Sequence, residues 1–150
     1  MSETVTKASQ SFLYLYHYTP AENISNILAS GLHPSTRDPN NPRSDAQWGD
    51  GQYLTDATPE EAECVTRQQF SYALFKIPWM FKAAPASLPT IGWLKIDVTD
   101  LPVQAVAPLF GQRFSGRSIF LNASQSSLPM IDRVVATGTI TFQPGPKGHR

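Results

Sequence analysis

Two short runs of apolar and aromatic residues in the first half of the chain are each followed by the pattern of a helix start. Residues 12–18 are dense in aromatic side chains and predict a strand. Thr19-Pro20-Ala21-Glu22 follows with a cap residue, a proline and an acid in helix-starting order. A second strand is predicted at residues 51–55, and Thr58-Pro59-Glu60-Glu61 repeats the same order. The pattern predicts two strand-to-helix units.

Helical spacing supports the first of these helices. Ile24, Ile27 and Leu28 recur on one helical face. Gly31 follows as a left-handed stop, which predicts the end of the helix there. The second helix is predicted to run to about Phe75. Both helices are expected to lay an apolar face on a sheet.

The second half of the chain changes to short strand-like runs separated by proline, glycine and serine. The predicted strands are residues 93–98, 103–106, 118–122 and 133–142. Helices early and strands late favour an α+β domain with mainly antiparallel sheets over alternating α/β winding.

Length and composition indicate one small domain. The chain has 150 residues, of which 41% are hydrophobic, and this is enough for a single core. We expect a disordered leader at 1–11, the working domain at 12–142 and a flexible tail at 143–150. Twelve lysine and arginine residues balance 12 aspartate and glutamate residues, which does not favour a nucleic-acid partner.

The sequence also favours a particular cellular location and argues against a cysteine-based metal site. The amino end lacks the apolar core of a secretory signal, and no apolar run reaches the ~18 residues of a membrane span. A soluble, cytoplasmic protein with no membrane partner is expected, with delivery as a secreted effector left open. The single cysteine, Cys64, excludes an internal disulfide and a cysteine-based zinc site, and no metal is expected.

The two early segments carry side chains that suit a nicotinamide dinucleotide. The His17 imidazole can hydrogen-bond ribose hydroxyls, and the Tyr53 ring offers a flat apolar face with a polar tip. Gly49 and Gly51 flank the start of the second strand, where backbone amides can approach a carboxamide or phosphate. Each residue also has an ordinary interpretation, His17 as a core histidine and Tyr53 as strand packing. Their occurrence in two matching segments favours the site.

These segments resemble a known family. Tyr14 to Thr19 and Gly49 to Asp56 are similar to the signature of the HYD-signature ADP-ribosyltransferase toxin family, in the His-Tyr-acid branch shared with diphtheria toxin and poly(ADP-ribose) polymerases. Residues 95–101 and 133–138 resemble later segments of that family, so the resemblance covers about residues 13–140. It implies a split β-sandwich of two mainly antiparallel sheets, with two main helices, around an NAD cleft.

The resemblance implies an NAD-consuming enzyme that cleaves the nicotinamide–ribose bond. Such an enzyme is a mono-ADP-ribosyltransferase acting on a protein or other macromolecule, or an NAD glycohydrolase, with NAD as substrate and no metal. An immunity or regulatory protein is a further partner that the family implies. The alternative is a catalytically inactive NAD- or ADP-ribose-binding module, or a protein-interaction domain, on the same fold.

The resemblance also implies roles for individual residues. His17 is expected to bind the adenosine-side ribose, and Tyr53 is expected to stack on the nicotinamide. Tyr18 is expected to contact the nicotinamide amide through its backbone. The full NAD-binding set implied is His17, Tyr18, Thr19, Gly51, Gln52, Tyr53 and Asp56.

An acid is needed as well, because the transition state resembles an oxocarbenium ion that a carboxylate stabilises. Family geometry favours Asp132, before the last strand, as the catalytic acid beside His17 and Tyr53. Asp56 and Asp97 are the alternatives. Met130 stands where many transferases carry an additional acid, which argues against arginine as the acceptor and leaves NAD hydrolysis open.

Overall fold

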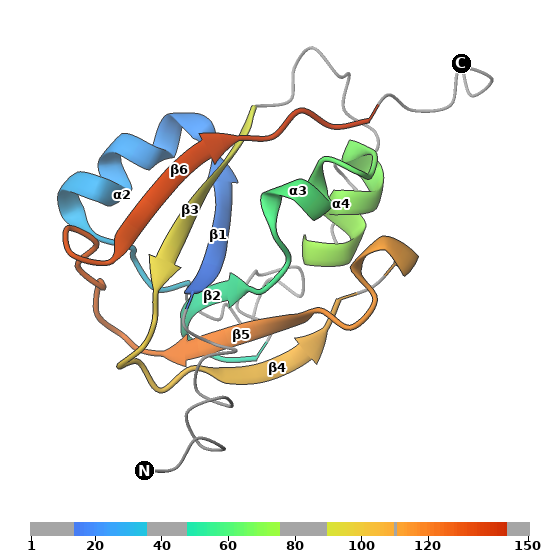
Figure 1. Ribbon diagram of the computed structural model, residues 1–150. Coiled ribbons are helices and arrows are strands. Elements are labelled where there is room, and N and C mark those ends of the chain that lie inside the picture. The colour runs from blue at the N-terminus through green and yellow to red at the C-terminus, as the bar shows by residue number, and fades with distance from the viewer. Residues whose placement is uncertain (1–13, 36–47, 76–89, 110, 144–150) are drawn as a thin grey trace, which may run out of the picture.

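Six antiparallel strands form one sheet in the computed structural model, which describes residues 14–35, 48–75, 90–109 and 111–143 (Figure 1). In sheet order the strands are β4 (Gln104–Pro108), β5 (Ser118–Ala123), β2 (Gly51–Thr55), β1 (Tyr14–Pro20), β3 (Ile91–Asp97) and β6 (Val134–Thr139). The helices are the short 3-10 turns η1 (Ala21–Asn23) and η4 (Gln112–Phe114), together with α2 (Ile24–Ser30), α3 (Pro59–Ala62) and α4 (Arg67–Phe75).

The strand predictions agree with the observed sheet. Each of the six predicted runs overlaps one strand, and the second, residues 51–55, coincides with β2. The α+β class and the antiparallel pairing are confirmed. The predicted leader (1–11) lies outside the described residues, as does the tail (143–150) beyond its first residue.

The sheet consists of two three-stranded halves that meet at one point. β1 pairs with β3 along its 7 residues, and β2 pairs with β5 along its 5 residues. Among the described residues, β1 and β2 share a single register pair, Tyr16 with Thr55. Figure 1 shows β1 and β2 running in clearly different directions. The prediction of two separate sheets is not confirmed, because this pair joins both halves into one hydrogen-bonded sheet.

Apolar side chains pack on both faces of the sheet. One cluster joins α3 and α4 to the sheet and includes Tyr18, Phe70 and Ile119. The other joins α2 to the opposite face and includes Leu15 and Ile27. β1 contributes to both clusters because successive side chains of a strand point to opposite faces. The position of β1 is thus held from both sides.

The two predicted helix starts fold differently. Thr58 forms the predicted capping box, in which its hydroxyl accepts the Glu61 N–H and the Glu61 carboxylate accepts the Thr58 N–H. Thr19 and Pro20 instead belong to β1, and no side chain caps η1. The predicted start at Thr19 is wrong because pairing with β3 continues the strand through both residues.

The second predicted helix is divided in two. α3 ends at Ala62 and α4 begins at Arg67. Thr66 and Gln69 form a second reciprocal cap, since the Gln69 N–H donates to Thr66 Oγ1 at 3.2 Å and the Thr66 N–H donates to Gln69 Oε1 at 2.9 Å. The spacing of threonine and glutamine in the sequence was the signal for this new start. Cys64 lies in the interruption and is exposed.

A side chain at Gly51, the first residue of β2, is expected to destabilise the fold. The φ of Gly51 is 147°, and an added Cβ would lie 2.3 Å from the Asn122 carbonyl oxygen. Gly51→Ala should lower the free energy of unfolding by more than about 2 kcal/mol, because backbone strain adds to a clash with backbone. Gly116→Ala is the matched control, since its φ of 82° is strained but nothing lies within 4 Å of an added Cβ. Equal losses in denaturant unfolding would contradict the clash.

Candidate functional site

The two segments singled out in the sequence come together where the halves of the sheet meet. Tyr16 pairs with Thr55, and next to this pair the His17 Nδ1 atom lies 3.1 Å from the Tyr53 carbonyl oxygen. A side chain therefore bonds to β2 at a place where β1 and β2 form no registered backbone pair. The structure brings the His17 imidazole against the backbone of Tyr53, and the NAD-binding roles of both residues stay a prediction.

This contact determines which ring nitrogen of His17 carries the hydrogen. A carbonyl oxygen can only accept, so Nδ1 carries the hydrogen. Burial lowers the pKa of His17, and the hydrogen bond to the Tyr53 carbonyl raises it by less, so the pKa lies below its ordinary value. At neutral pH the ring is uncharged, and Nε2 has a lone pair that accepts a hydrogen bond from a hydroxyl.

The Tyr53 ring is held by its own hydroxyl group. The hydroxyl donates to the Gly49 carbonyl at 2.5 Å and accepts from the Trp48 N–H at 2.9 Å. The indole of Trp48 lies beside the phenol ring, with centroids 6.3 Å apart and planes tilted by 44°. Tyr53 is partly buried, whereas Trp48 is exposed. The turn before β2 thus fixes the orientation of a partly accessible aromatic ring.

Tyr18 and Thr19 are buried, and their side chains have partners within the fold. The Tyr18 hydroxyl donates to the Ala57 carbonyl at 2.7 Å, and its ring packs edge-on against Phe70. Burial raises the pKa of Tyr18 far above its ordinary value, so the phenol stays neutral. The Thr19 hydroxyl accepts from the Asn23 amide at 3.3 Å. A ligand contact with the Tyr18 backbone, as predicted, does not require its side chain.

Gln52 serves the fold through its side chain. It is 1% exposed, and its amide nitrogen donates to the carbonyls of Leu32 and Ser126. Its amide oxygen accepts from Asn122 of β5 at 2.9 Å. Sequence reasoning missed Asn122, although a polar residue within the apolar run of β5 was a signal of a buried polar network. This network locks β2 to β5.

Asp56 lies directly after β2 in a cluster of charged side chains. Its Oδ1 accepts from the Ser118 N–H at 2.8 Å, and its Oδ2 lies 4.0 Å from Arg117 Nη1. Arg117 also donates from Nε to Glu61 at 2.9 Å. Burial raises the pKa of Glu61, but the Thr58 N–H and Arg117 outweigh it, so the pKa lies below its ordinary value. Arg117, which the sequence did not single out, orders the carboxylates between β2 and β5.

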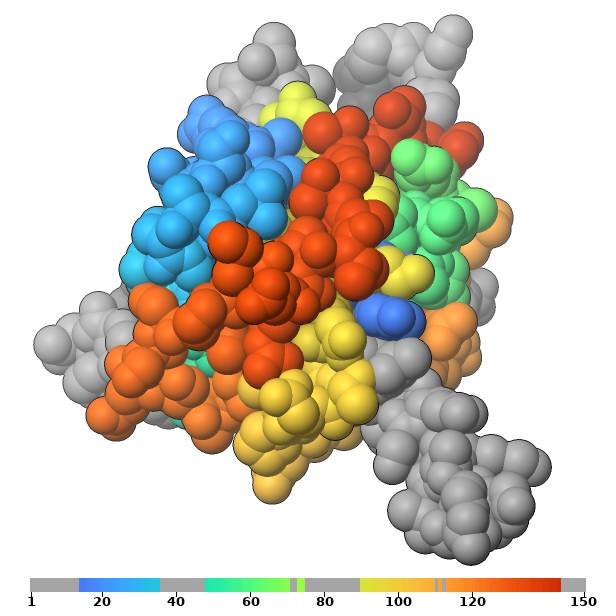
Figure 2. All heavy atoms as spheres, turned by 60° about the vertical axis from the view of Figure 1, so that its left-hand side comes forward, coloured from blue at the N-terminus to red at the C-terminus, as the bar shows by residue number. Residues whose placement is uncertain are grey.

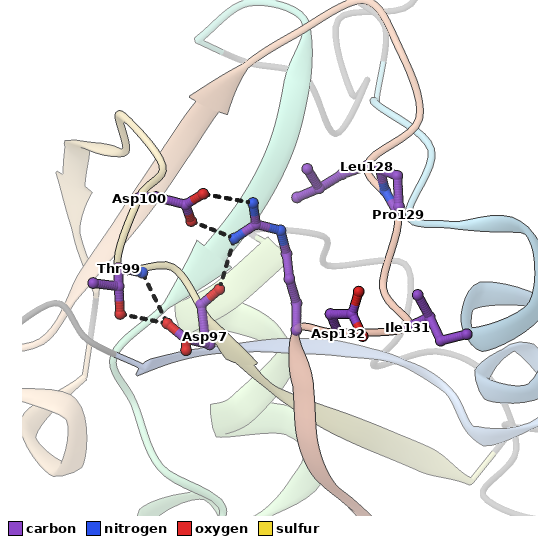
Figure 3. A pocket seen from close by; sticks show the side chains of 8 residues that line it. Asp97, Thr99, Asp100, Leu128, Pro129, Ile131 and Asp132 are labelled. Carbon is purple, nitrogen blue, oxygen red and sulfur yellow. Dashed lines mark hydrogen bonds and ion pairs between the residues drawn. The ribbon is translucent and has the colours of Figure 1, made fainter.

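Asp132 and Asp97 lie in a different part of the sheet. Both line a hollow of about 380 Å³ at the start of β6 (Figure 3). In sheet order, β1 and β3 stand between β2, which carries Tyr53, and β6, which Asp132 precedes. The sheet order does not bring Asp132 to the His17–Tyr53 contact, and its catalytic role stays a prediction.

Across the described ranges, no group of three His, Cys, Asp or Glu side chains gathers as a metal-binding cluster. Within the same ranges, no helix has the length and apolar character needed to cross a membrane.

Comparison with known proteins provides the family. A family model described as HYD1 signature containing ADP-ribosyltransferase matches residues 15–112, more than half of the chain. The chain belongs to this family. The resemblance inferred from the two segments is thereby confirmed, and with it a general role as a toxin-family transferase. ADP-ribosyltransferases use NAD as a substrate and transfer ADP-ribose to an acceptor. No curated protein and no solved structure was found to match the chain significantly.

The part of this ADP-ribosyltransferase that matches the family model includes the two strands of the candidate site. His17, Tyr53, Asp56 and Asp97 fall within residues 15–112. Asp132 falls outside them. The match therefore covers the His17–Tyr53 contact and two of the three candidate acids.

The stability of this ADP-ribosyltransferase is expected to fall as pH drops below about 6.5. The folded pKa of His17 lies below its ordinary value of 6.5, so in this range the unfolded chain binds a proton that the folded chain does not. The stability that this difference contributes is present above pH 6.5 and is lost as pH falls toward the folded pKa. Denaturant unfolding between about pH 8 and 5 should show a smaller decline for His17→Asn than for the wild type.

The exposed His33 supplies the control for this pH experiment. His33→Asn should keep the full wild-type decline. A decline in His17→Asn as large as that of the wild type would show that His17 is not the group responsible.

Proposed function

We propose that this ADP-ribosyltransferase binds NAD where β1 and β2 separate and cleaves its nicotinamide–ribose bond. The observation that supports this most directly is the contact of His17 Nδ1 with the Tyr53 carbonyl, which ties the neutral imidazole of β1 to the backbone of the β2 residue that carries the aromatic ring. In the proposed complex, His17 Nε2 accepts a hydrogen bond from a ribose hydroxyl. The Tyr53 ring stacks on the nicotinamide.

The two halves of the sheet then act as the two layers of a split β-sandwich with NAD between them. The single register pair of Tyr16 and Thr55 supports this proposal, because among the described residues the backbone ladder between β1 and β2 does not continue beyond it. The Tyr18 backbone, next to this point, is the proposed contact for the carboxamide. Gly51 stays a predicted contact for the phosphates, although its N–H and C=O pair with the backbone of Ser35 at 3.0 and 2.8 Å. Gln52 and Thr19 support the site from the interior.

Bond cleavage moves the glycosidic electron pair onto the nicotinamide nitrogen, which leaves as neutral nicotinamide. Positive charge develops on the ribose carbon and its ring oxygen, and a nearby carboxylate stabilises it. The nucleophile then bonds to that carbon and loses its proton. A macromolecular nucleophile gives ADP-ribosyl transfer, and water gives NAD hydrolysis. Met130, which is fully buried, supplies no acid for recruiting an arginine acceptor.

Among the three candidate acids, the sheet order favours Asp56. It follows β2 directly, three residues after Tyr53, and the Ser118 N–H orients its carboxylate. Asp97 ends β3 and Asp132 precedes β6, and both line the hollow that lies on the side of β1 away from β2. We therefore place Asp56 first and keep Asp132, which family geometry favours, as the alternative.

A binding module without turnover is the second candidate. One observation favours it: Oδ1 of Asp56 is engaged by Ser118, and Oδ2 lies near Arg117, so the carboxylate that the sheet order favours already has partners. Such a module predicts a rise in melting temperature with NAD but no release of nicotinamide. A pure protein-interaction domain predicts neither effect.

Release of free nicotinamide from NAD is the test of turnover. Asp56→Asn, which keeps the shape and removes the charge, should lower kcat by about 10²-fold while NAD affinity stays within about threefold. Asp132→Asn should retain most of the activity. The opposite ranking would assign the acid to Asp132. Wild-type protein that releases no nicotinamide, with or without candidate acceptors, would contradict the enzyme and leave the binding module.

Tyr53 variants test the stacking role by calorimetric titration with NAD. Tyr53→Ala should raise the Kd for NAD by about tenfold, since stacked aromatic pairs contribute roughly 0.5–1.5 kcal/mol. Tyr53→Phe keeps the ring and should change the Kd by less than about threefold. Tyr14→Ala, at the first residue of β1, is the control and should bind NAD as the wild type does. Wild-type affinity in Tyr53→Ala would remove the ring from the site.

A further inference from the structure

β6 is an edge strand without the usual protection against pairing. It ends the sheet, and within the described part of the chain no strand lies on its outer side. Its six residues, Val134–Thr139, include no charged residue and no proline, the types that commonly guard exposed edges. Alternate N–H and C=O groups of an edge strand point outward and can pair with another chain. Figure 2 shows this region uncovered at the front of the molecule.

Two exposed aliphatic side chains mark the same edge. Ile131 is 82% exposed and Val135 is 54% exposed, the highest values among the large hydrophobic residues described. Consecutive residues of β3 pair with Val134 and Ala136, which leaves Val135 as the extra residue of a bulge. A bulge redirects a side chain and partly protects an edge strand from pairing with another chain. This bulge ends at Ala136, so the rest of β6 lacks that protection. Aliphatic side chains this exposed are typical of a contact surface.

The hollow at the start of β6 adds charge to this surface. Its lining includes Asp97, Asp100, Asp132 and Arg133, with Ile131 in its apolar wall (Figure 3). Arg133 forms a two-pronged ion pair with Asp100, at 2.7 and 3.2 Å. Three aspartates and one arginine therefore line the hollow, which gives its lining a net negative charge.

The remaining groups nearby leave this negative charge in place. Hydrogen bonds from the Thr99 hydroxyl and N–H hold the pKa of Asp97 below its ordinary value, so this carboxyl stays ionised at neutral pH. Lys95, the next cation along β3, lies over the Tyr14 ring, 4.9 Å from its centroid, and does not line the hollow. The hollow therefore suits a cationic side chain.

We propose that a partner protein adds an extended segment to the outer edge of β6 and places a lysine or arginine side chain in the hollow beside Asp97 and Asp132. Main-chain hydrogen bonds along β6 would provide affinity, and Ile131 and Val135 would provide apolar contact. The carboxylates select a basic segment over an acidic one. This surface is separate from the His17–Tyr53 contact, but its hollow includes Asp132, the alternative catalytic acid, so the inference rests on Asp56 as the acid of the proposed function. Nicotinamide release by Asp56→Asn and Asp132→Asn checks that assignment independently of peptide binding.

A second copy of the chain is a poorer occupant of this edge. Two copies related by a two-fold axis would pair their β6 strands antiparallel. The hollow at the start of one strand would then face residues 139–143 of the other copy, which contain no lysine or arginine. Charge complementarity therefore favours a different protein.

Selection of random linear peptides on the full chain tests the proposal. Enriched peptides should combine β-branched or aromatic residues with a lysine or arginine. Replacing that cation by glutamate should weaken binding by at least about tenfold in fluorescence anisotropy. Val135→Lys and Ile131→Lys should each weaken binding by about the same factor, because each puts a cation on the edge. Leu28→Lys, at a 41% exposed position on α2, is the control and should bind as the wild type does.

Several results would overturn the proposal. These are a selection that enriches no peptide, enriched peptides without a cation, and unchanged binding by both edge variants. Ile131 precedes β6 and lies outside the strand pairing, so Ile131→Lys decides the matter if Val135→Lys alters the fold, as judged by circular dichroism. A wild-type dimer in sedimentation velocity that either edge variant dissociates would also overturn it, since a second copy would then occupy the edge.

Discussion

Among the described residues, one register pair, Tyr16 with Thr55, joins the backbone ladders of the two halves of the sheet, and the candidate site depends on the fact that the registered pairing stops there. A continued ladder would place His17 opposite Leu54 and occupy the Tyr53 carbonyl with a backbone donor. The His17 side chain instead bonds that carbonyl. The end of the ladder therefore allows this contact, which places the hydrogen on Nδ1. Burial lowers the pKa of His17 more than the hydrogen bond raises it, so the imidazole stays neutral and Nε2 remains an acceptor.

Each half of the sheet is tied separately, so the junction can be this small. In one half, the buried amides of Gln52 and Asn122 lock β2 to β5. In the other, β1 pairs with β3 along its full length. The Tyr18 hydroxyl crosses between the halves to the Ala57 carbonyl, next to the end of β2. Buried polar groups with all their partners close by favour one arrangement of the strands, because an alternative would leave them unsatisfied.

Charge is distributed unevenly in a chain that is neutral overall. Asp56 and Glu61 share Arg117 at the junction of β2 and β5. At the far edge, Arg133 pairs with Asp100, and further aspartates line the same hollow. The equal numbers of acidic and basic residues in the sequence do not reveal either cluster of charged side chains. Two acidic regions, one beside the candidate site and one beside an open edge, thus carry separate roles in our proposals.

The sequence by itself determined the six strands, the α+β class, the cap at Thr58 and the pairing of His17 with Tyr53 as candidates, because alternation and capping are local patterns. Tertiary structure decided the rest. Strand pairing overrode the helix signal at Thr19, since a backbone ladder satisfies more groups than a single cap. Sheet order, which no local pattern encodes, placed Asp132 beside Asp97 and placed Asp56 next to β5, and which acid is catalytic stays a prediction. Contacts between distant segments are fixed by the packing of the whole sheet. The position of each candidate acid relative to His17 and Tyr53 depends on such contacts, so no local pattern of the sequence reveals it.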